Sequence, residues 1–286
     1  MIGHPLHSDE SSLRSIWREI FHDSEEFVDL FFRKMYSEES TLVYRSGSEI
    51  AGMVFFPEYE FKFGSKRSNL GYMCGAATLP EFRNKGIMGQ MINHSVEIMK
   101  ERGYGYAALI PASDSLYGYY ERFGFHDFFF KKRYTAKRSD SLTGSPFSFE
   151  RLSDFGRLFD TYKASVSRLN AVVLQSEKSY RTAIEDLGLS GGVVLTSANR
   201  DLFCFAISEG SVVYLKEMFC CRPHYDPYPD LVISLFKHFP EAETIIAEGP
   251  VESIKSDSVP FRTGMIKALS DENNPAGPGY MNFMLE

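Results

Sequence analysis

The chain opens with two runs of apolar residues at helical spacing. In residues 8–21 the apolar side chains lie three or four positions apart, at Leu13, Ile16, Trp17 and Ile20. This spacing places them on one face of a helix. A second run starts at residues 23–26, where Asp-Ser-Glu-Glu supplies the polar and acidic side chains that favour a helix N-terminus. We therefore predict two short helices joined by a tight bend.

Segments rich in β-branched and aromatic residues come next. They predict strands at residues 41–44, 49–56, 59–63 and 65–78. The first two flank Arg45-Ser46-Gly47-Ser48, which has the composition of a hairpin turn. Apolar residues return to helical spacing from Gly86 to Glu101, and Gly103 ends that helix. The apolar run 106–110 predicts a strand parallel to the one before the helix, in a right-handed βαβ unit.

The second half of the chain repeats this order of elements. A polar run rich in serine and glycine, residues 137–146, predicts a linker between the halves. Beyond it we predict helices at 152–169, 176–187 and 229–239, strands at 192–197, 202–209, 212–219 and 244–247, and closing segments at 261–269 and 280–285. The sequence thus predicts an α/β fold with a mixed sheet, built from two similar modules, residues 1–138 and 145–286.

Residues 71–92 form the first candidate site. The predicted strand ends in the small residues Gly75-Ala76-Ala77-Thr78, where a ligand can approach the backbone. Pro80 stops the strand because proline cannot donate to a sheet ladder. A basic turn from Arg83 to Gly89 then leads into the helix. Its unpaired N–H groups and the helix dipole attract anions, and its glycines leave room for a diphosphate against the backbone.

The same stretch resembles the acyl-CoA-binding motif of the GNAT acetyltransferases. The family pattern is (Arg/Gln)-x-x-Gly-x-(Gly/Ala) at the start of a helix, and Arg83 and Gly86 match it. Met88 stands where the family usually has glycine or alanine, and Gly89 follows one position late. Eis-like members of the family also carry a larger residue there. The alternative interpretation is a basic turn before an ordinary surface helix.

A second stretch, Leu116–Phe125, resembles the closing signature of that family. In the family a helix ends in (Leu/Phe)-Tyr-Glu-x-x-Gly-Phe, and residues 120–125 match its last six positions. The family's tyrosine four residues before the glycine lies beside the thioester sulfur, and the matching residue is Tyr120. Two motifs in the order that the family has them are stronger evidence for the resemblance than either motif alone. The alternative is that Tyr120 is a packed aromatic and that Tyr117 or Tyr119 is the exposed tyrosine.

The resemblance implies acetyl transfer from acetyl-CoA to an amine. It assigns cofactor binding to Ala76, Ala77, Thr78, Arg83, Asn84, Lys85, Gly86, Ile87, Met88 and Gly89. Ser115 or Ser113 would contact the pantetheine arm, with helix capping as the alternative role for either residue. Tyr120 would act as the acid for the leaving thiolate or hydrogen-bond its sulfur.

The general base is not evident from the sequence. Many GNAT enzymes use a glutamate on the strand before the phosphate turn, but residues 72–78 contain none. A chain of water molecules is one solution. Asp23, Glu25 and Glu26 are candidates because the N-terminal helices form one wall of the acceptor site in the family. Their position at a helix N-terminus also explains these residues without a catalytic role.

Composition narrows the classes of function. The 286 residues are 43% hydrophobic and 24% charged, with a net charge of −7, so we expect no nucleic-acid partner. Neither a signal peptide nor a run of about 20 apolar residues is evident, so we expect no membrane partner. The four cysteines form no C-x-x-C pair, which favours a reduced, cytoplasmic setting. Cys220-Cys221 with His224 lacks a second ligand pair at a usable spacing, so we expect no metal.

The whole arrangement resembles the Eis-like acetyltransferases, in which a catalytic GNAT module precedes a GNAT-like module. Many of those proteins add a sterol-carrier-like domain, which we expect this chain to lack. In Eis proteins the C-terminal carboxylate serves as the base, a role that we do not carry over to Glu286, because Glu286 follows the second module. Arg262-Thr263-Gly264 has the wrong spacing for a phosphate turn, so we expect the second module to hold no CoA.

The resulting hypothesis is an acetyl-CoA-dependent N-acetyltransferase that acts on a primary amine. We expect a cationic acceptor, either a small molecule or a protein lysine. The alternative is a non-catalytic acyl-CoA-binding or regulatory protein on the same fold, which Met88 and the missing strand carboxylate motivate. A third hypothesis assigns the second module to partner binding or dimerisation, which would make the protein a homo-oligomer.

Overall fold

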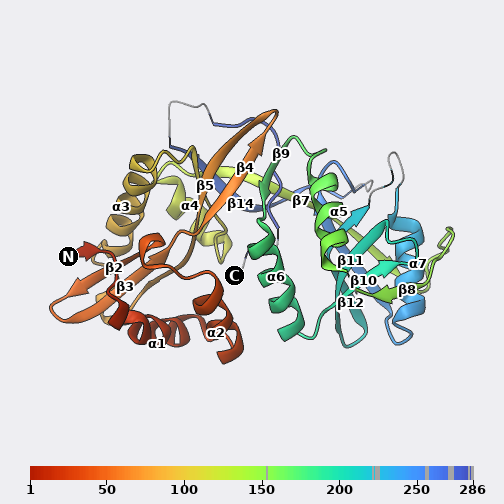
Figure 1. Ribbon diagram of the computed structural model, residues 1–286, viewed down its shortest axis with the longest axis horizontal. Coiled ribbons are helices and arrows are strands. Elements are labelled where there is room, and N and C mark those ends of the chain that lie inside the picture. The colour runs from red at the N-terminus through yellow and green to blue at the C-terminus, as the bar shows by residue number, and fades with distance from the viewer. Residues whose placement is uncertain are drawn as a thin grey trace.

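The front half folds into two helices, a run of strands and a crossover helix, as predicted (Figure 1). The computed structural model describes residues 1–152, 154–220, 222, 226–254, 258–269, 274–282 and 284. The strands are β1 (Ile2–Gly3), β2 (Thr41–Ser46), β3 (Glu49–Phe55), β4 (Glu58–Phe63), β5 (Lys66–Thr78), β6 (Tyr106–Leu109) and β7 (His126–Lys137). The helices are α1 (Glu10–Phe21), α2 (Glu25–Lys34), α3 (Ile87–Glu101) and α4 (Asp114–Glu121), with 3-10 turns at His7–Asp9, Glu38–Ser40 and Pro80–Phe82.

The second half follows the predicted order with two additional short strands, β8 and β9. Its strands are β8 (Phe149–Arg151), β9 (Ala171–Leu174), β10 (Val193–Ser197), β11 (Leu202–Glu209), β12 (Val212–Cys220), β13 (Thr244–Pro250) and β14 (Phe261–Ala268). Its helices are α5 (Phe155–Val166), α6 (Glu177–Leu189) and α7 (Tyr228–His238). None of the helices in the described ranges has the length and apolar character that a membrane span requires.

One mixed sheet runs through both halves, which confirms the predicted fold class. Its order is β1-β2-β3-β5-β6-β14-β7-β13-β12-β11-β10-β8, and β4 bridges β5 and β9. Two pairs are parallel, β5 with β6 and β12 with β13. In each pair a helix makes the crossover, α3 in the first and α7 in the second. The predicted βαβ unit of the front half is therefore present, and the second half contains a similar one.

Strand β14 lies in the sheet of the front half although it comes from the end of the chain. It pairs antiparallel with β6, where Met265 lies opposite Leu109, and with β7, where Phe261 lies opposite Lys131. The division into residues 1–138 and 145–286 stays a prediction. If it holds, a strand of the second range completes the sheet of the first.

Helices cover both faces of the sheet in each half (Figure 1). In the front half α1 and α2 pack on one face around Trp17 and Phe31, and α3 packs on the other around Met91 and Ile92. In the second half α5 and α6 share an aromatic cluster around Tyr180, while α7 packs on a separate cluster. Each helix has an apolar stripe and a polar outer face, which is the pattern of a helix that covers a sheet.

A fifth apolar cluster joins the halves. It combines Phe61 and Phe129 of the front half with Val173 of β9 and Met281 near the end of the chain. Burial of apolar surface is the main source of stability in a folded domain. Because this cluster takes side chains from both halves, their folding is expected to be coupled.

The front half should therefore not be stable alone. We expect a fragment of residues 1–138 to show no cooperative unfolding transition, because β6 and β7 lose the strand that lies between them. Circular dichroism during thermal denaturation measures this, with the full chain as reference. Co-expression of residues 139–286 should restore a folded complex. A fragment 1–138 that unfolds cooperatively near the full chain's melting temperature contradicts the prediction.

Candidate functional site

The parallel strands β5 and β6 separate part of the way along β5. They pair from Leu70 and Tyr106 to Met73 and Leu109. Strand β5 then continues to Thr78 beside β3. In the described part of the chain, no residue of β6 pairs with β5 beyond Met73. The edge of β5 that faces this opening presents backbone N–H and C=O groups. Such groups bind a ligand that carries amides of its own.

Gly75 makes the bend at this separation. Its φ of +55° lies in the left-handed region, and the register of β3 against β5 shifts opposite it. A Cβ at this position would lie 2.6 Å from Cδ2 of Phe55 and 2.8 Å from Cζ3 of Trp17. Glycine is therefore required both by the backbone angle and by the aromatic packing. Of the next two residues, Ala76 packs against the α3 cluster, and Ala77 is buried under α1 and α2.

The predicted basic turn leads directly into α3. Residues 83–86 are exposed, and Arg83 holds the turn by donating from Nε to the Thr78 carbonyl oxygen at 3.0 Å. Asn84 and Gly86 have φ values of 62° and 72°, and Gly86 is the N-cap of α3. The first N–H groups of a helix have no intrahelical partner. In α3 these are the N–H groups of Ile87 and the residues that follow it, and they lie beside two exposed cations, Arg83 and Lys85.

Met88 and Gly89 are accommodated in the first turn of α3. The Met88 side chain is half-buried and packs against the core cluster of α3, which directs it away from the exposed turn. A Cβ on Gly89 would lie 3.1 Å from Cζ of Phe123. Met88 thus stands where the family pattern usually has a small residue, and its side chain does not cover the turn. Gly89 lets the end of the α4 segment approach α3.

Tyr120 lies on the side of α4 that faces α3. Its ring packs against the α3 cluster, with ring centroids 5.3 Å from Tyr119 and 6.2 Å from Phe125. Burial raises the pKa of Tyr120 to about 12. The phenol therefore keeps its proton at neutral pH and is available as a hydrogen-bond donor.

Ser113 and Ser115 lie at the exposed start of α4. Their Oγ atoms are 2.9 Å apart, and Ser113 is the N-cap residue, although its side chain makes no capping hydrogen bond. Both hydroxyls are exposed. They remain candidates for contact with a ligand beside α4.

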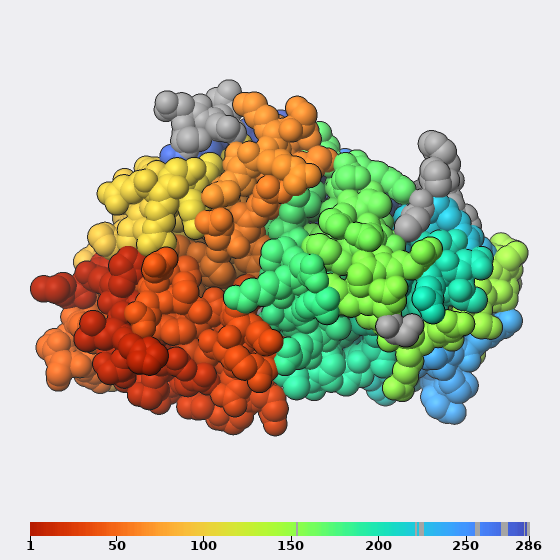
Figure 2. Space-filling model, viewed as in Figure 1, coloured from red at the N-terminus to blue at the C-terminus, as the bar shows by residue number. Residues whose placement is uncertain are grey.

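A cavity of about 620 Å³ opens where β6 ends, and we call it the central cavity. The front half contributes Ile110, Pro111, Tyr117 and Lys131 to its wall. Residues of α6, β11, β12 and β13 form the opposite wall, and β14 and residues 281, 282 and 284 contribute the rest. In the space-filling view the front half, in red and orange, meets α6, in green, along a continuous seam (Figure 2). Both halves of the chain therefore build this cavity.

Arg262 connects β14 to α4 at the rim of the central cavity. Its guanidinium lies 3.8 Å from the ring centroid of Tyr117. It donates to Asp114 Oδ1 at 3.0 Å and to Asp127 Oδ2 at 3.3 Å. The hydrogen bonds to Asp114 and Asp127 raise the pKa of Arg262 and fix the start of α4 against β14. Arg262-Thr263-Gly264 is thus part of a strand in the front sheet.

The second half has its own diverging parallel pair. Strands β12 and β13 pair from Val212 and Thr244 to Leu215 and Ala247, and a second cavity of about 510 Å³ lies beyond. Asp226 stands just before α7, where the front half carries a basic turn. An acidic residue there repels a diphosphate, and the expectation that this half holds no CoA stays a prediction.

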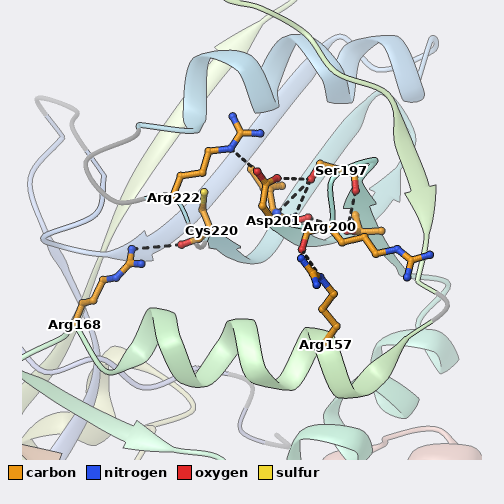
Figure 3. A network of polar contacts seen from close by, with 9 residues as sticks. Arg157, Arg168, Ser197, Arg200, Asp201, Cys220 and Arg222 are labelled. Carbon is orange, nitrogen blue, oxygen red and sulfur yellow. Dashed lines mark hydrogen bonds and ion pairs between the residues drawn. The ribbon is translucent and has the colours of Figure 1, made fainter.

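A polar network lies beside the second cavity (Figure 3). Arg222 donates from Nε to Asp201 Oδ2 at 2.5 Å, and Ser197 Oγ donates to the other oxygen at 2.7 Å. Burial alone would raise the pKa of Asp201, but these hydrogen bonds hold it below its usual value. Arg157 and Arg168 donate instead to the backbone carbonyls of Arg200 and Cys220. The arginine side chains point in different directions, so the network braces the β10–β11 turn rather than forming one anion site.

The other sequence candidates either do not line the central cavity or lie outside the described residues. Cys221, His224 and Glu286 lie outside the described residues, and no three His, Cys, Asp or Glu side chains of the described ranges cluster as a metal ion would require. Asp23 Oδ2 accepts from Trp17 Nε1 at 2.8 Å, and Glu25 pairs with Arg18 at 2.6 Å. Glu26 is exposed. None of these three carboxylates is among the described residues that line the central cavity.

A buried carboxyl group, Glu217, was not anticipated from the sequence. Tyr280 Oη donates to both of its oxygens at 2.9 Å, and Asn282 Nδ2 donates to Oε2 at 2.6 Å. Lys131 Nζ in turn donates to Asn282 Oδ1 at 2.5 Å. Burial raises the pKa of Glu217 despite these donors. The network ties the end of the chain to β12 between the two cavities, and nothing in the local sequence around Glu217 indicates it.

A family model matches most of the front half. Residues 6–127 match the model described as an acetyltransferase (GNAT) domain. This range includes the diverging strands, the basic turn and Tyr120. A search of curated protein sequences finds no match to the chain.

Solved structures resemble the chain over almost its whole length. Eis1 from Mycobacterium abscessus aligns with a TM-score of 0.71 at 12% identity, over 94% of this chain and 74% of that chain. The GCN5-related N-acetyltransferase from Anabaena variabilis aligns at 0.76 and 13%, over 94% and 73%. That from Kribbella flavida aligns at 0.73 and 15%, over 94% and 70%. At these identities the likeness shows the fold. Residues 6–127 thus match a GNAT acetyltransferase domain, and together with the fold this match supports an acyltransferase.

Proposed function

We propose that the protein is an N-acetyltransferase that transfers an acetyl group from acetyl-CoA to a primary amine. The observation that carries this proposal is the separation of β5 from β6, followed directly by the basic, positive-φ turn at α3. An open strand edge suits the amides of the pantetheine arm, and a helix N-terminus with exposed cations suits the diphosphate. The match of residues 6–127 to an acetyltransferase domain supports the same assignment.

Each predicted donor-site residue has a role in this proposal. The backbone of Ala76, Ala77 and Thr78 pairs with the pantetheine amides and polarises the thioester carbonyl. The backbone from Gly86 to Gly89 and the side chains of Arg83, Asn84 and Lys85 hold the diphosphate. Ser115 contacts the arm beside α4. Tyr120 donates a hydrogen bond to the sulfur.

The acceptor binds in the central cavity. A volume of about 620 Å³ lies in the range of small-molecule sites, and it also admits a lysine side chain. Its wall includes Ile110, the first residue after β6, so the cavity reaches the point from which β5 and β6 separate. An amine bound there has access to a thioester held at that point. A cationic amine remains the expected acceptor.

The reaction at the thioester proceeds through three events, each of which changes the charge on one atom. The amine nitrogen attacks the carbonyl carbon, negative charge develops on the carbonyl oxygen, and the C–S bond then breaks to release a thiolate. Backbone N–H groups of β5 stabilise the oxygen. A phenol with a pKa of about 12 is a weaker acid than a thiol, whose pKa is about 8.5. Tyr120 therefore acts chiefly by donating a hydrogen bond to the developing thiolate.

The competing function is a non-catalytic acyl-CoA-binding or regulatory protein. It predicts CoA binding without thiol release. The side chain of Met88 packs against the core rather than over the turn, which removes one of the two reasons for this alternative. The other reason, a β5 strand without a carboxylate between Tyr72 and Thr78, remains.

Replacement of Tyr120 by phenylalanine tests the catalytic role. We expect Tyr120→Phe to lower the rate of thiol release from acetyl-CoA by about 10- to 100-fold and to leave the Kd for CoA within about twofold. The rate is measured with a panel of alkylamines and the Kd by calorimetry. Tyr104→Phe is the control, because Tyr104 is a buried tyrosine of the same cluster near the opposite end of α3. An unchanged rate in Tyr120→Phe would exclude the proposed role.

Two glycines that flank α3 provide a matched test of the diphosphate site. Gly86 and Gly103 have φ values of 72° and 76°, and at neither residue does any atom lie within 4 Å of the position that a Cβ would take. An alanine at either site should cost about 1–2 kcal/mol of backbone strain. We expect Gly86→Ala alone to raise the Kd for CoA, by about tenfold, since the Cβ would meet the diphosphate. Equal Kd values in Gly86→Ala and Gly103→Ala would show that CoA does not use this turn.

A further inference from the structure

The proposed function requires a group that accepts a proton from the acceptor amine, and none has been assigned. The assignment of such a base rests on the proposed function. An alkylamine is mostly protonated at neutral pH, and its nitrogen must lose protons for the amide to form. No carboxylate lies on β5 between Tyr72 and Thr78. The group that accepts the proton must therefore be sought on the other walls of the central cavity.

Two carboxylates belong to the described residues that line this cavity, Asp186 on α6 and Glu248 on β13. Glu248 is already paired, because Arg133 donates to its Oε1 from Nε at 2.9 Å and from Nη2 at 2.6 Å. Within the described ranges, no donor is hydrogen-bonded to the side chain of Asp186 and no cation is paired with it. Asp186 is also only half-buried, so its carboxylate can meet a ligand in the cavity.

The cations of the cavity have other partners. Lys131 donates to Asn282 at 2.5 Å, and Arg262 donates to Asp114 and Asp127. Lys216 is exposed and lies over the ring of Tyr214 at 5.4 Å. The charge that acts most directly on Asp186 is negative and belongs to Asp23. Burial and Asp23 together raise the pKa of Asp186, which makes its carboxylate a stronger base than an ordinary aspartate.

Contacts on the outer side of α6 fix this arrangement. Glu185, the preceding residue, pairs with Arg33 of α2 at 2.7 Å. Asp23 is held by the indole of Trp17 at 2.8 Å, within the aromatic cluster under α1 and α2. The front half therefore positions both α6 and the negative charge next to Asp186. Asp186 remains free to face the cavity.

We propose that the Asp186 carboxylate is the general base that accepts the proton lost by the acceptor amine. The amine reacts in its neutral form, after its first proton has gone to solvent. Its nitrogen forms a bond to the carbonyl carbon and gains positive charge, so that the attached N–H becomes strongly acidic. That proton passes to Asp186, the C–S bond breaks, and the electron pair of this bond leaves on the thiolate. Asp186 then returns the proton to solvent. The base of the reaction is thus supplied by the second half of the chain.

The test compares Asp186→Asn with Glu177→Gln in the full chain. Asparagine keeps the size of Asp186 but cannot accept the proton. We expect Asp186→Asn to lower kcat/KM for an alkylamine by about 100-fold or more, with the Kd for CoA and the melting temperature unchanged. Glu177→Gln removes an exposed carboxylate of the same helix that pairs with Arg181 and does not line the cavity, and its kcat/KM should stay within about threefold of the wild type.

A second acceptor distinguishes two roles of Asp186, that of a general base and that of a residue that only maintains the shape of the cavity. A hydrazine is a weaker base than an alkylamine, so the N–H of its positively charged intermediate is more acidic and loses its proton to water more readily. We expect the loss in Asp186→Asn to be at least tenfold smaller with the hydrazine. Loss of shape in the cavity would reduce both reactions equally, and that result would overturn the proposal.

The pH profile gives an independent readout. The ratio of the wild-type kcat/KM to that of Asp186→Asn, measured with one alkylamine, should decrease toward one at low pH as Asp186 becomes protonated, because protonation of the acceptor affects both proteins equally. Asp23→Asn removes the neighbouring negative charge and lowers the pKa of Asp186, so the decrease should occur at lower pH when both proteins also carry Asp23→Asn. A ratio that does not change with pH would overturn the proposal.

Failure of the proposed function gives a different result. If wild-type protein releases no thiol with any amine, both the acetyltransferase and the base assignment are wrong. If wild-type protein turns over and Asp186→Asn turns over equally fast, only the base assignment is wrong.

Discussion

The front sheet is complete only when β14, from the end of the chain, lies between β6 and β7. Strand β6 is four residues long and too short to hold the sheet together by itself. It pairs with β5 on one side, through Met73 and Leu109, and with β14 on the other, through Leu109 and Met265. Held on both sides, β6 ends at Leu109 while β5 continues. The opening proposed to hold the acyl donor therefore depends on a strand more than 150 residues further along the chain.

The same dependence extends to the central cavity. Near the end of the chain Gly279 pairs with Phe129 of β7, and the following residues Tyr280 and Asn282 donate to Glu217 of β12. A buried carboxyl group is costly unless donors satisfy its oxygens, so these hydrogen bonds specify where the end of the chain lies. Met281 then faces the cavity. The cavity is thus shaped by a segment whose position is set by polar contacts in the second half.

Local patterns in the sequence predicted most of the individual elements. The helices around Trp17 and Met91 follow from apolar spacing, and the turn at Gly86 follows from a glycine in a basic segment before a helix. These features depend on residues close together in the chain. Position within the sheet is different, since any apolar run of strand length pairs equally well with several partners. Residues 261–269 were recognised as a closing segment, but no local feature indicates a place between β6 and β7.

The candidate site divides in the same way. The donor-site residues from Ala76 to Gly89 are contiguous, so a motif reveals them. Asp186 is one of several acidic residues on α6. It differs from the adjacent Glu185 in the neighbours that its carboxylate has in the folded chain. Glu185 meets Arg33, whereas Asp186 meets the cavity and Asp23. Such a difference exists only in the folded chain. Spacing on the helix cannot indicate it.

The packing around β5 explains why a base would come from the opposite wall. Gly75 has no room for a side chain beside Phe55 and Trp17. Ala77 is 2% exposed and faces the apolar cluster of α1 and α2, where a carboxylate would be buried without a partner. An unpaired buried charge costs several kcal/mol. The aromatic packing that bends β5 and opens the donor site thus also excludes carboxylates at these two positions, and the base that we propose comes instead from α6, across the cavity.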